Sequence, residues 1–123
     1  MNRPIISRLN EHELVQRFTS IALAQDEALN ADNTTQYNKL FGDMELVKAE
    51  LKGRHGDQSR LLLPLLLHPN AQVRLKSAIA TLAMDREAAL AALQKISDQN
   101  EYPQAAYARD MLSAVAEGRY QPT

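Results

Sequence analysis

The chain has 123 residues, of which 45% are hydrophobic and 24% are charged, and its formal net charge is −1. This size and composition predict one soluble globular domain. A balance so close to neutral disfavours nucleic acids and anionic membranes as partners, because both attract strongly basic proteins. The sequence contains no cysteine, which excludes disulfides, thiolate nucleophiles and cysteine-based metal sites.

Neither end of the sequence predicts a targeting or membrane segment. Only Ile5 and Ile6 precede the return of polar residues, too little for the apolar core of a secretory signal. The longest apolar run, Leu61 to Leu67, is far shorter than the roughly 20 residues of a membrane-spanning helix. We therefore expect a cytoplasmic protein with one domain over residues 1–123, in which residues 1–9 and 119–123 are flexible tails.

The spacing of apolar residues predicts six helices and no strand, because these residues recur every three or four positions. The expected helices span, in chain order, about 11–31, 35–52, 58–67, 71–83, 86–97 and 103–118. We expect Asn10 to cap the first helix, with Glu13 reaching back to complete a capping box. Asn70 and Asp85 are the expected caps of the fourth and fifth helices.

Two prolines mark a repeat in this helical pattern. Pro69 and Pro103 lie 34 residues apart, and each stands just ahead of an alanine-containing helix. The spacing is close to the length of two-helix repeats. A third proline, Pro64, falls inside the third expected helix and should bend it, because it removes a backbone donor. We therefore expect an all-α fold with three antiparallel helix pairs stacked in a short right-handed superhelix.

The segment from Leu62 to Leu82 resembles a HEAT repeat. It has a proline in the first helix, a Pro69-Asn70 turn, and Val73-Arg74 with small residues on the second helix. The whole chain is also similar to a small bacterial family of HEAT-like proteins known as a domain of unknown function, and the segments that carry this likeness are 14–18, 37–41, 103–105 and 117–118. The resemblance implies a fold and no activity. The amino-terminal pair has longer helices and lacks the Val-Arg signature, so it is either a repeat or a capping hairpin.

The likeness to HEAT units also implies a role for Arg74. In such units this arginine usually reaches a carboxylate of the next unit. Asp110 and Asp85 are the two candidate partners, and we expect the ion pair to be structural.

Candidate chemistry elsewhere is weak. His12-Glu13 is similar to the His-Glu pairs that hold iron in some HEAT-repeat oxygenases, but it occurs once, and Gln16 breaks the HExxH zinc pattern. The acidic residues Asp26, Glu27, Asp32, Asp43, Glu45 and Glu50 have the spacing of solvated helix faces. The basic residues Lys48, Lys52, Arg54 and Arg60 complement a helix end and have no aromatic residues between them to stack bases. We expect no metal, no cofactor and no enzymatic activity.

Binding of another protein remains as the expected function. In stacked pairs the second helix of each unit lines the concave face. The candidate contact residues on these helices are Tyr37, Asp43, Lys76, Tyr107 and Asp110, although both tyrosines could equally belong to the core. A sharper hypothesis is an immunity protein that neutralises a bacterial toxin. The alternatives are a nucleic-acid-related or enzymatic role on the same scaffold, and the chain could be a monomer or a homodimer.

Overall fold

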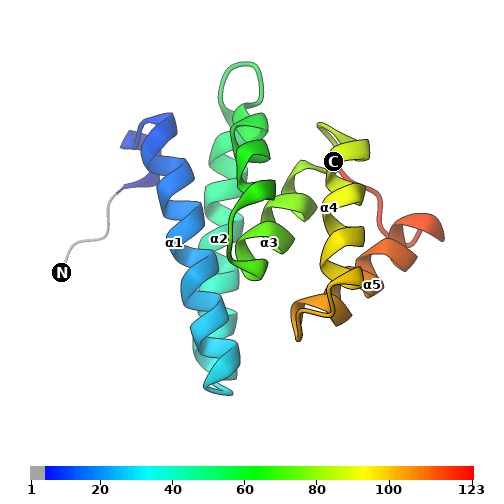
Figure 1. Ribbon diagram of the computed structural model, residues 1–123. Helices are drawn as coiled ribbons and strands as arrows, with labels where there is room; N and C mark the ends of the chain where they lie inside the picture. Colours follow the sequence, from blue (N-terminus) through cyan, green and yellow to red (C-terminus); the bar gives the residue numbers. More distant parts are fainter. Residues whose placement is uncertain (1–4) are drawn as a thin grey trace. The chain divides into compact units, whose positions relative to one another are not determined.

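The computed structural model describes residues 5–123, and every regular element in that range is helical (Figure 1). The elements are η1 (Ile6–Arg8), α1 (Glu11–Asn30), α2 (Thr34–Gly53), η2 (Gln58–Leu67), α3 (Ala71–Thr81), α4 (Arg86–Asp98) and α5 (Gln104–Ala116), where η denotes a 3-10 helix. The predicted all-α class is confirmed. Contacts within the chain divide it into two compact units, with the boundary between Leu61 and Leu62. The single domain over residues 1–123 stays a prediction.

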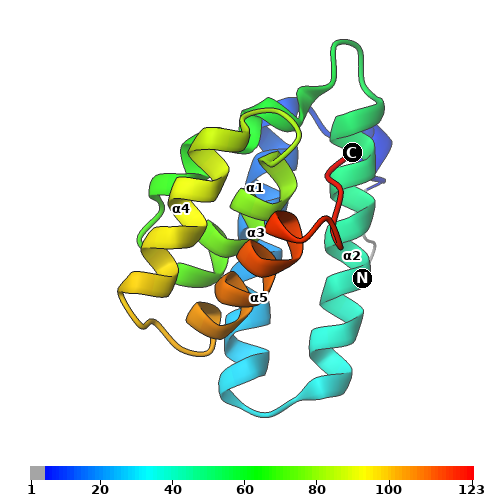
Figure 2. The ribbon, with the colours of Figure 1, turned by 90° about the vertical axis from the view of Figure 1, so that its right-hand side faces the viewer.

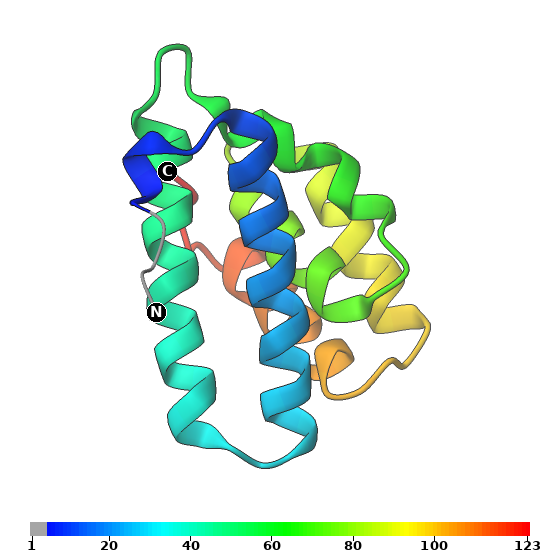
Figure 3. The ribbon, with the colours of Figure 1, turned by 90° about the vertical axis from the view of Figure 1, so that its left-hand side faces the viewer.

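The first unit is a helical hairpin in which α1 and α2 run side by side in opposite directions (Figure 3). The predicted capping box begins it. The Glu13 amide donates to Asn10 Oδ1 at 2.8 Å, and the Asn10 amide donates to Glu13 Oε1 at 2.9 Å. Asn33, which accepts from the Gln36 amide, caps α2 after the turn. The buried apolar side chains of the hairpin are Leu14, Phe18, Ile21, Ala22, Ala28, Leu40, Met44, Val47 and Leu51.

Parts of both expected tails make defined contacts. Residues 1–4 lie outside the described residues, but η1 packs beside α2, and Arg54 at the end of α2 donates to the Ile6 carbonyl at 3.4 Å. At the other end, the Tyr120 amide donates to the Ala114 carbonyl, and the tyrosine side chain packs on the core of the second unit.

The second unit has its core between α3, α4 and α5 (Figure 2). Helix α4 packs against both α3 and α5. Asn70 and Asp85 cap α3 and α4 as predicted, since each side-chain oxygen accepts amide hydrogens from the first turn. The buried members of this core are Leu75, Ala78, Leu82, Ala89, Leu93, Ile96, Ala108 and Val115.

The segment from Gln58 to Leu67 differs from the prediction. It is a 3-10 helix and not a kinked α-helix. Pro64 explains the difference, because its ring nitrogen has no hydrogen to donate and its ring crowds the carbonyl four residues back, which disfavours the α-helical pattern. Within this segment Leu62 is fully buried, whereas Leu67 is 87% exposed.

The predicted pairing is confirmed for α1 with α2 and for α4 with α5. It is wrong for the middle pair, because α3 packs more extensively on α4 than on η2. The prediction that each of the two prolines 34 residues apart precedes a helix is confirmed, since Pro69 lies just before α3 and Pro103 just before α5. The equivalent residues differ in burial, however: Val73 is fully buried, and Tyr107 is 46% exposed.

Candidate functional site

A groove of about 590 Å³ opens on the second unit between the end of η2 and one face of α4. Three leucines of η2 form one wall, and three alanines of α4 form the other. The groove also reaches His68 and Pro69 in the turn between η2 and α3, and Lys95 in the last turn of α4. The lining apolar residues are Leu63, Leu66, Leu67, Pro69, Ala88, Ala91 and Ala92.

The geometry of the 3-10 helix produces the leucine wall. Because a 3-10 helix has three residues per turn, Leu63 and Leu66 fall on the same face. Leu66 also reaches the core of the second unit, which anchors this wall. Leu67 is the last residue of η2 and stands at the lip of the groove, with 87% of its surface in solvent.

The alanine wall follows from the two faces of α4. One face carries Ala89, Leu93 and Ile96 into the core, where all three are fully buried. The groove face carries small residues at a spacing of three and four positions, and a side chain of one carbon leaves open space beside the helix. The groove exists because neither wall fills that space.

Arg74 fixes the polar end of the groove with a fork of hydrogen bonds. Its guanidinium donates twice to the Glu101 carboxylate, at 2.9 Å to each oxygen, and also to the His68 carbonyl at 2.7 Å and the Pro69 carbonyl at 3.3 Å. Hydrogen bonding from Arg74 lowers the pKa of Glu101 below its ordinary value, and the nearby Lys95 charge adds to the effect. The arginine therefore ties the turn before α3 to the turn after α4.

The prediction that Arg74 pairs with Asp110 or Asp85 is wrong. Asp85 is the cap of α4, and its carboxylate accepts from the Ala88 amide at 3.1 Å. Asp110 lies exposed on α5. The turn after α4 brings Glu101 back over the start of α3, which no helical spacing in the sequence encodes.

His68 belongs to the same polar end. Its ring Nδ1 accepts from the Asn70 amide at 3.0 Å, and Asn70 in turn accepts from the Gln72 and Val73 amides. The imidazole is therefore held in the turn by the backbone that begins α3.

The two ends of α4 give the groove opposite charges. Asp85 lies at one end of the groove face, and Lys95 lies at the other in the last turn of the helix. Lys95 comes ten positions after Asp85, which corresponds to about 15 Å along the axis. Lys95 is exposed, and its ammonium forms no ion pair within residues 5–123.

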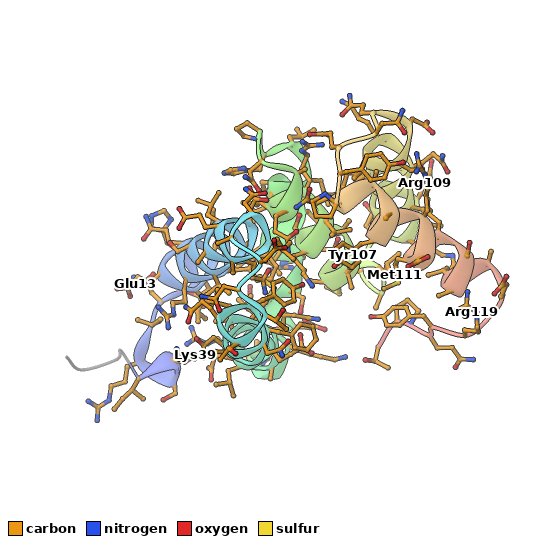
Figure 4. All side chains as sticks on the ribbon, turned by 90° about the horizontal axis from the view of Figure 1, so that it is seen from below. Glu13, Lys39, Tyr107, Arg109, Met111 and Arg119 are labelled. Carbon is orange, nitrogen blue, oxygen red and sulfur yellow. The ribbon has the colours of Figure 1, made fainter. Side chains whose placement is uncertain are left out.

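A second polar cluster lies at the turn between α4 and α5. Arg109 extends from α5 toward that turn (Figure 4) and donates to Ser97 Oγ at 2.9 Å, the Ser97 carbonyl at 2.8 Å and Asn100 Oδ1 at 2.7 Å. It also donates to the Tyr102 hydroxyl, and its guanidinium carbon lies 5.4 Å from the centre of that ring. These contacts hold the turn that presents Glu101 to Arg74.

The five contact residues predicted from the sequence do not line the groove. Tyr37 and Asp43 are half-buried on α2 of the first unit, and Asp43 accepts from Lys39 at 3.5 Å. In the second unit, Lys76 is half-buried on α3, and α5 carries the 46%-exposed Tyr107 together with Asp110. The prediction placed the contacts on the second helix of each expected pair, whereas the groove is lined by η2 and α4, which are first helices of those pairs. The sequence features that indicate this groove are the leucine run in residues 61–67 and the alanine-rich segment that forms α4.

Neither a cluster of metal ligands nor a membrane-spanning helix is found among residues 5–123. No three histidine, aspartate or glutamate side chains in that range gather as metal ligands. Glu13 of the His12-Glu13 pair serves the capping box. None of the described helices combines the length and apolar character needed to cross a bilayer.

The elements above define an all-α protein built from packed helices, with an apolar groove on its second unit. The chain belongs to the family described as Domain of unknown function (DUF2019), whose model matches residues 12–116. The predicted resemblance to a domain of unknown function is thereby confirmed. The chain is also similar to the crystal structure of the protein RPA1889 from Rhodopseudomonas palustris CGA009, with 35% sequence identity, a TM-score of 0.93, and coverage of 98% of this chain and 100% of that chain. No curated protein matches the sequence.

Proposed function

We propose that the chain is a protein-binding module without catalytic activity, and that the η2–α4 groove is its contact surface. The observation that carries this proposal is Leu67, which is 87% exposed at the lip of a groove of about 590 Å³. Covering a leucine side chain fully contributes about 1.5–3 kcal/mol. A partner that covers Leu67 gains that free energy, which makes this leucine a strong candidate for an anchor residue.

The walls of the groove also favour a protein partner. Both walls are helical, and a groove between two helical elements accepts the apolar face of a third helix, which is a common mode of peptide recognition. The Arg74 fork holds one end of the groove in a fixed shape. A preformed groove lowers the entropy cost of binding.

Two further features of the sequence concern the architecture and the cellular location of the protein. The HEAT-like sequence pattern of residues 62–82 and the packing of α4 on α5 support a short right-handed HEAT-like superhelix as the proposed architecture, although η2 and α3 do not form one of its pairs. A crystal structure of the chain tests this architecture. The absence of cysteine is compatible with the proposed cytoplasmic location. Fractionation of cells that produce the protein tests that location.

A pair of leucine substitutions tests the groove. The protein is co-expressed with the products of neighbouring genes, and complexes are isolated by size-exclusion chromatography and measured by calorimetry. Leu67→Asp should abolish complex formation, whereas Leu46→Asp, on α2 at 58% exposure and outside the groove, should not. Circular dichroism confirms that both variants fold. A complex that tolerates Leu67→Asp contradicts the assignment of the groove.

The immunity hypothesis is the sharper form of this proposal. A small helical protein that covers the working surface of a toxin would protect the cell that produces it. Growth of cells that express a neighbour-encoded toxin, with and without this protein, tests that form directly. Failure to protect removes the immunity role and leaves the more general proposal to the binding assay.

A further inference from the structure

We infer that the groove takes an amphipathic helix of another protein, which runs antiparallel to α4 and places a carboxylate against Lys95. This inference rests on the proposed function of the groove and specifies the chemistry and direction of its occupant. It follows from the alanine wall, the exposed leucine and the charges at the two ends of α4.

The alanine wall selects a helix as the occupant. The distance between two packed helix axes falls toward about 8 Å when the side chains at the contact are small. Ala88, Ala91 and Ala92 provide such a contact along α4. Larger side chains of an incoming helix then reach down into the space beside the alanines, while Leu67 packs between them from the opposite wall.

The length of the charged face sets the length of the occupant. Asp85 and Lys95 are separated by about 15 Å along α4, which corresponds to roughly ten residues of a helix lying alongside. An occupant of three to four turns therefore spans both charges. Its apolar residues fall at positions i, i+3, i+4 and i+7, the spacing that keeps one face on the groove.

Charge complementarity sets the direction. Helices favour acidic residues in the first turn and basic residues in the last turn, because these complement the helix dipole. An antiparallel occupant brings its acidic first turn to Lys95 and its basic last turn to Asp85. A parallel occupant would instead place like charges together at both ends.

Lys95 is the cation available for this contact. The guanidinium of Arg74, the other cation lining the groove, is engaged by both oxygens of Glu101 and by two backbone carbonyls. The Glu101 carboxylate is likewise held by Arg74. Lys95 lines the groove and forms no ion pair among residues 5–123, although its charge acts on Glu101, whose two carboxylate oxygens Arg74 already engages.

A displayed peptide library tests the inference. The probe is a set of helical peptides of about 16 residues with leucine or phenylalanine at the four groove positions and random residues elsewhere, selected for binding to the full chain. Selected peptides should carry aspartate or glutamate in their first turn. Lys95→Glu should weaken their binding roughly three- to tenfold, and replacing the acidic peptide residue by lysine should restore it.

The control is Lys52→Glu, which reverses an exposed lysine in the last turn of α2, outside the groove. It should leave peptide binding unchanged. Peptides that lose binding on Leu67→Asp but show no acidic first turn and no response to Lys95→Glu would overturn the inferred direction and leave the proposed function standing.

Two other outcomes would contradict the proposed function or the identity of the partner. A library with no binder sensitive to Leu67→Asp contradicts the proposed function itself. Light scattering that shows a dimer of the wild type and a monomer of Leu67→Asp identifies a second copy of the chain as the occupant, which overturns the inferred partner.

Discussion

Replacing Arg74 by methionine should destabilise the second unit by about 2 kcal/mol. The substitution keeps most of the unbranched apolar stem of the side chain and removes its charge and its donors. The ion pair to Glu101 contributes about 1 kcal/mol, since the Glu101 side chain is 34% exposed and water screens the interaction. The short bond to the His68 carbonyl contributes about 1 kcal/mol more, and the longer one to Pro69 contributes less.

The assay is urea unfolding followed by circular dichroism, with the slope of the transition checked against wild type. Arg86→Met is the matched control, because Arg86 is exposed in the first turn of α4, and a surface change of this kind stays within about 0.5 kcal/mol. Glu101→Gln combined with Arg74→Met measures the coupling of the pair, expected to be about 1 kcal/mol.

The same pair predicts a dependence on pH. The folded pKa of Glu101 is lowered, so its stabilising contribution is complete above the unfolded pKa and is lost as the pH falls through the folded pKa. The difference between wild type and Arg74→Met should therefore shrink in acid. A difference below about 0.5 kcal/mol at neutral pH, or one that does not change in acid, would show that the ion pair between Arg74 and Glu101 does not stabilise the fold.

The remaining predictions concern a cap, a core residue and a turn. Asn10→Ala removes the capping box of α1 and should lower the free energy of unfolding by about 1 kcal/mol, measured in urea; an unchanged midpoint would show that the box contributes nothing. Leu93→Ala, at a fully buried position, should lower it by about 2–5 kcal/mol, and an effect as small as that of an exposed leucine would contradict the core assignment. Arg109→Met should speed hydrogen exchange at the turn after α4, around Ser97 and Asn100, with little change in α1; uniform exchange rates would exclude the proposed role in the turn.

Local signals in the sequence predicted the helices well. Asn10, Asn70 and Asp85 all cap the helices expected of them, because a cap depends on residues within one turn. The recurrence of apolar residues every three or four positions also matches the buried positions of α2, which are Leu40, Met44, Val47 and Leu51.

Interactions between distant segments were predicted less well. The partner of Arg74 is Glu101, whose position depends on the path of a turn and not on any helical period. The 3-10 form of η2 depends on how its backbone accommodates Pro64. The groove in turn depends on the 3-10 form of η2, because it forms where this helix ends beside the alanine face of α4. Its polar end depends on the ion pair between Arg74 and Glu101.

The most direct test of the groove as a contact surface is a nuclear magnetic resonance titration of the labelled chain with a selected helical peptide. A contact surface at the groove should give chemical-shift changes concentrated at Leu63, Leu66 and Leu67 and along Ala88 to Lys95, and these changes should be lost in Leu67→Asp. Changes concentrated instead around Tyr107 and Asp110 on α5, with residues 63–67 unaffected, would contradict it.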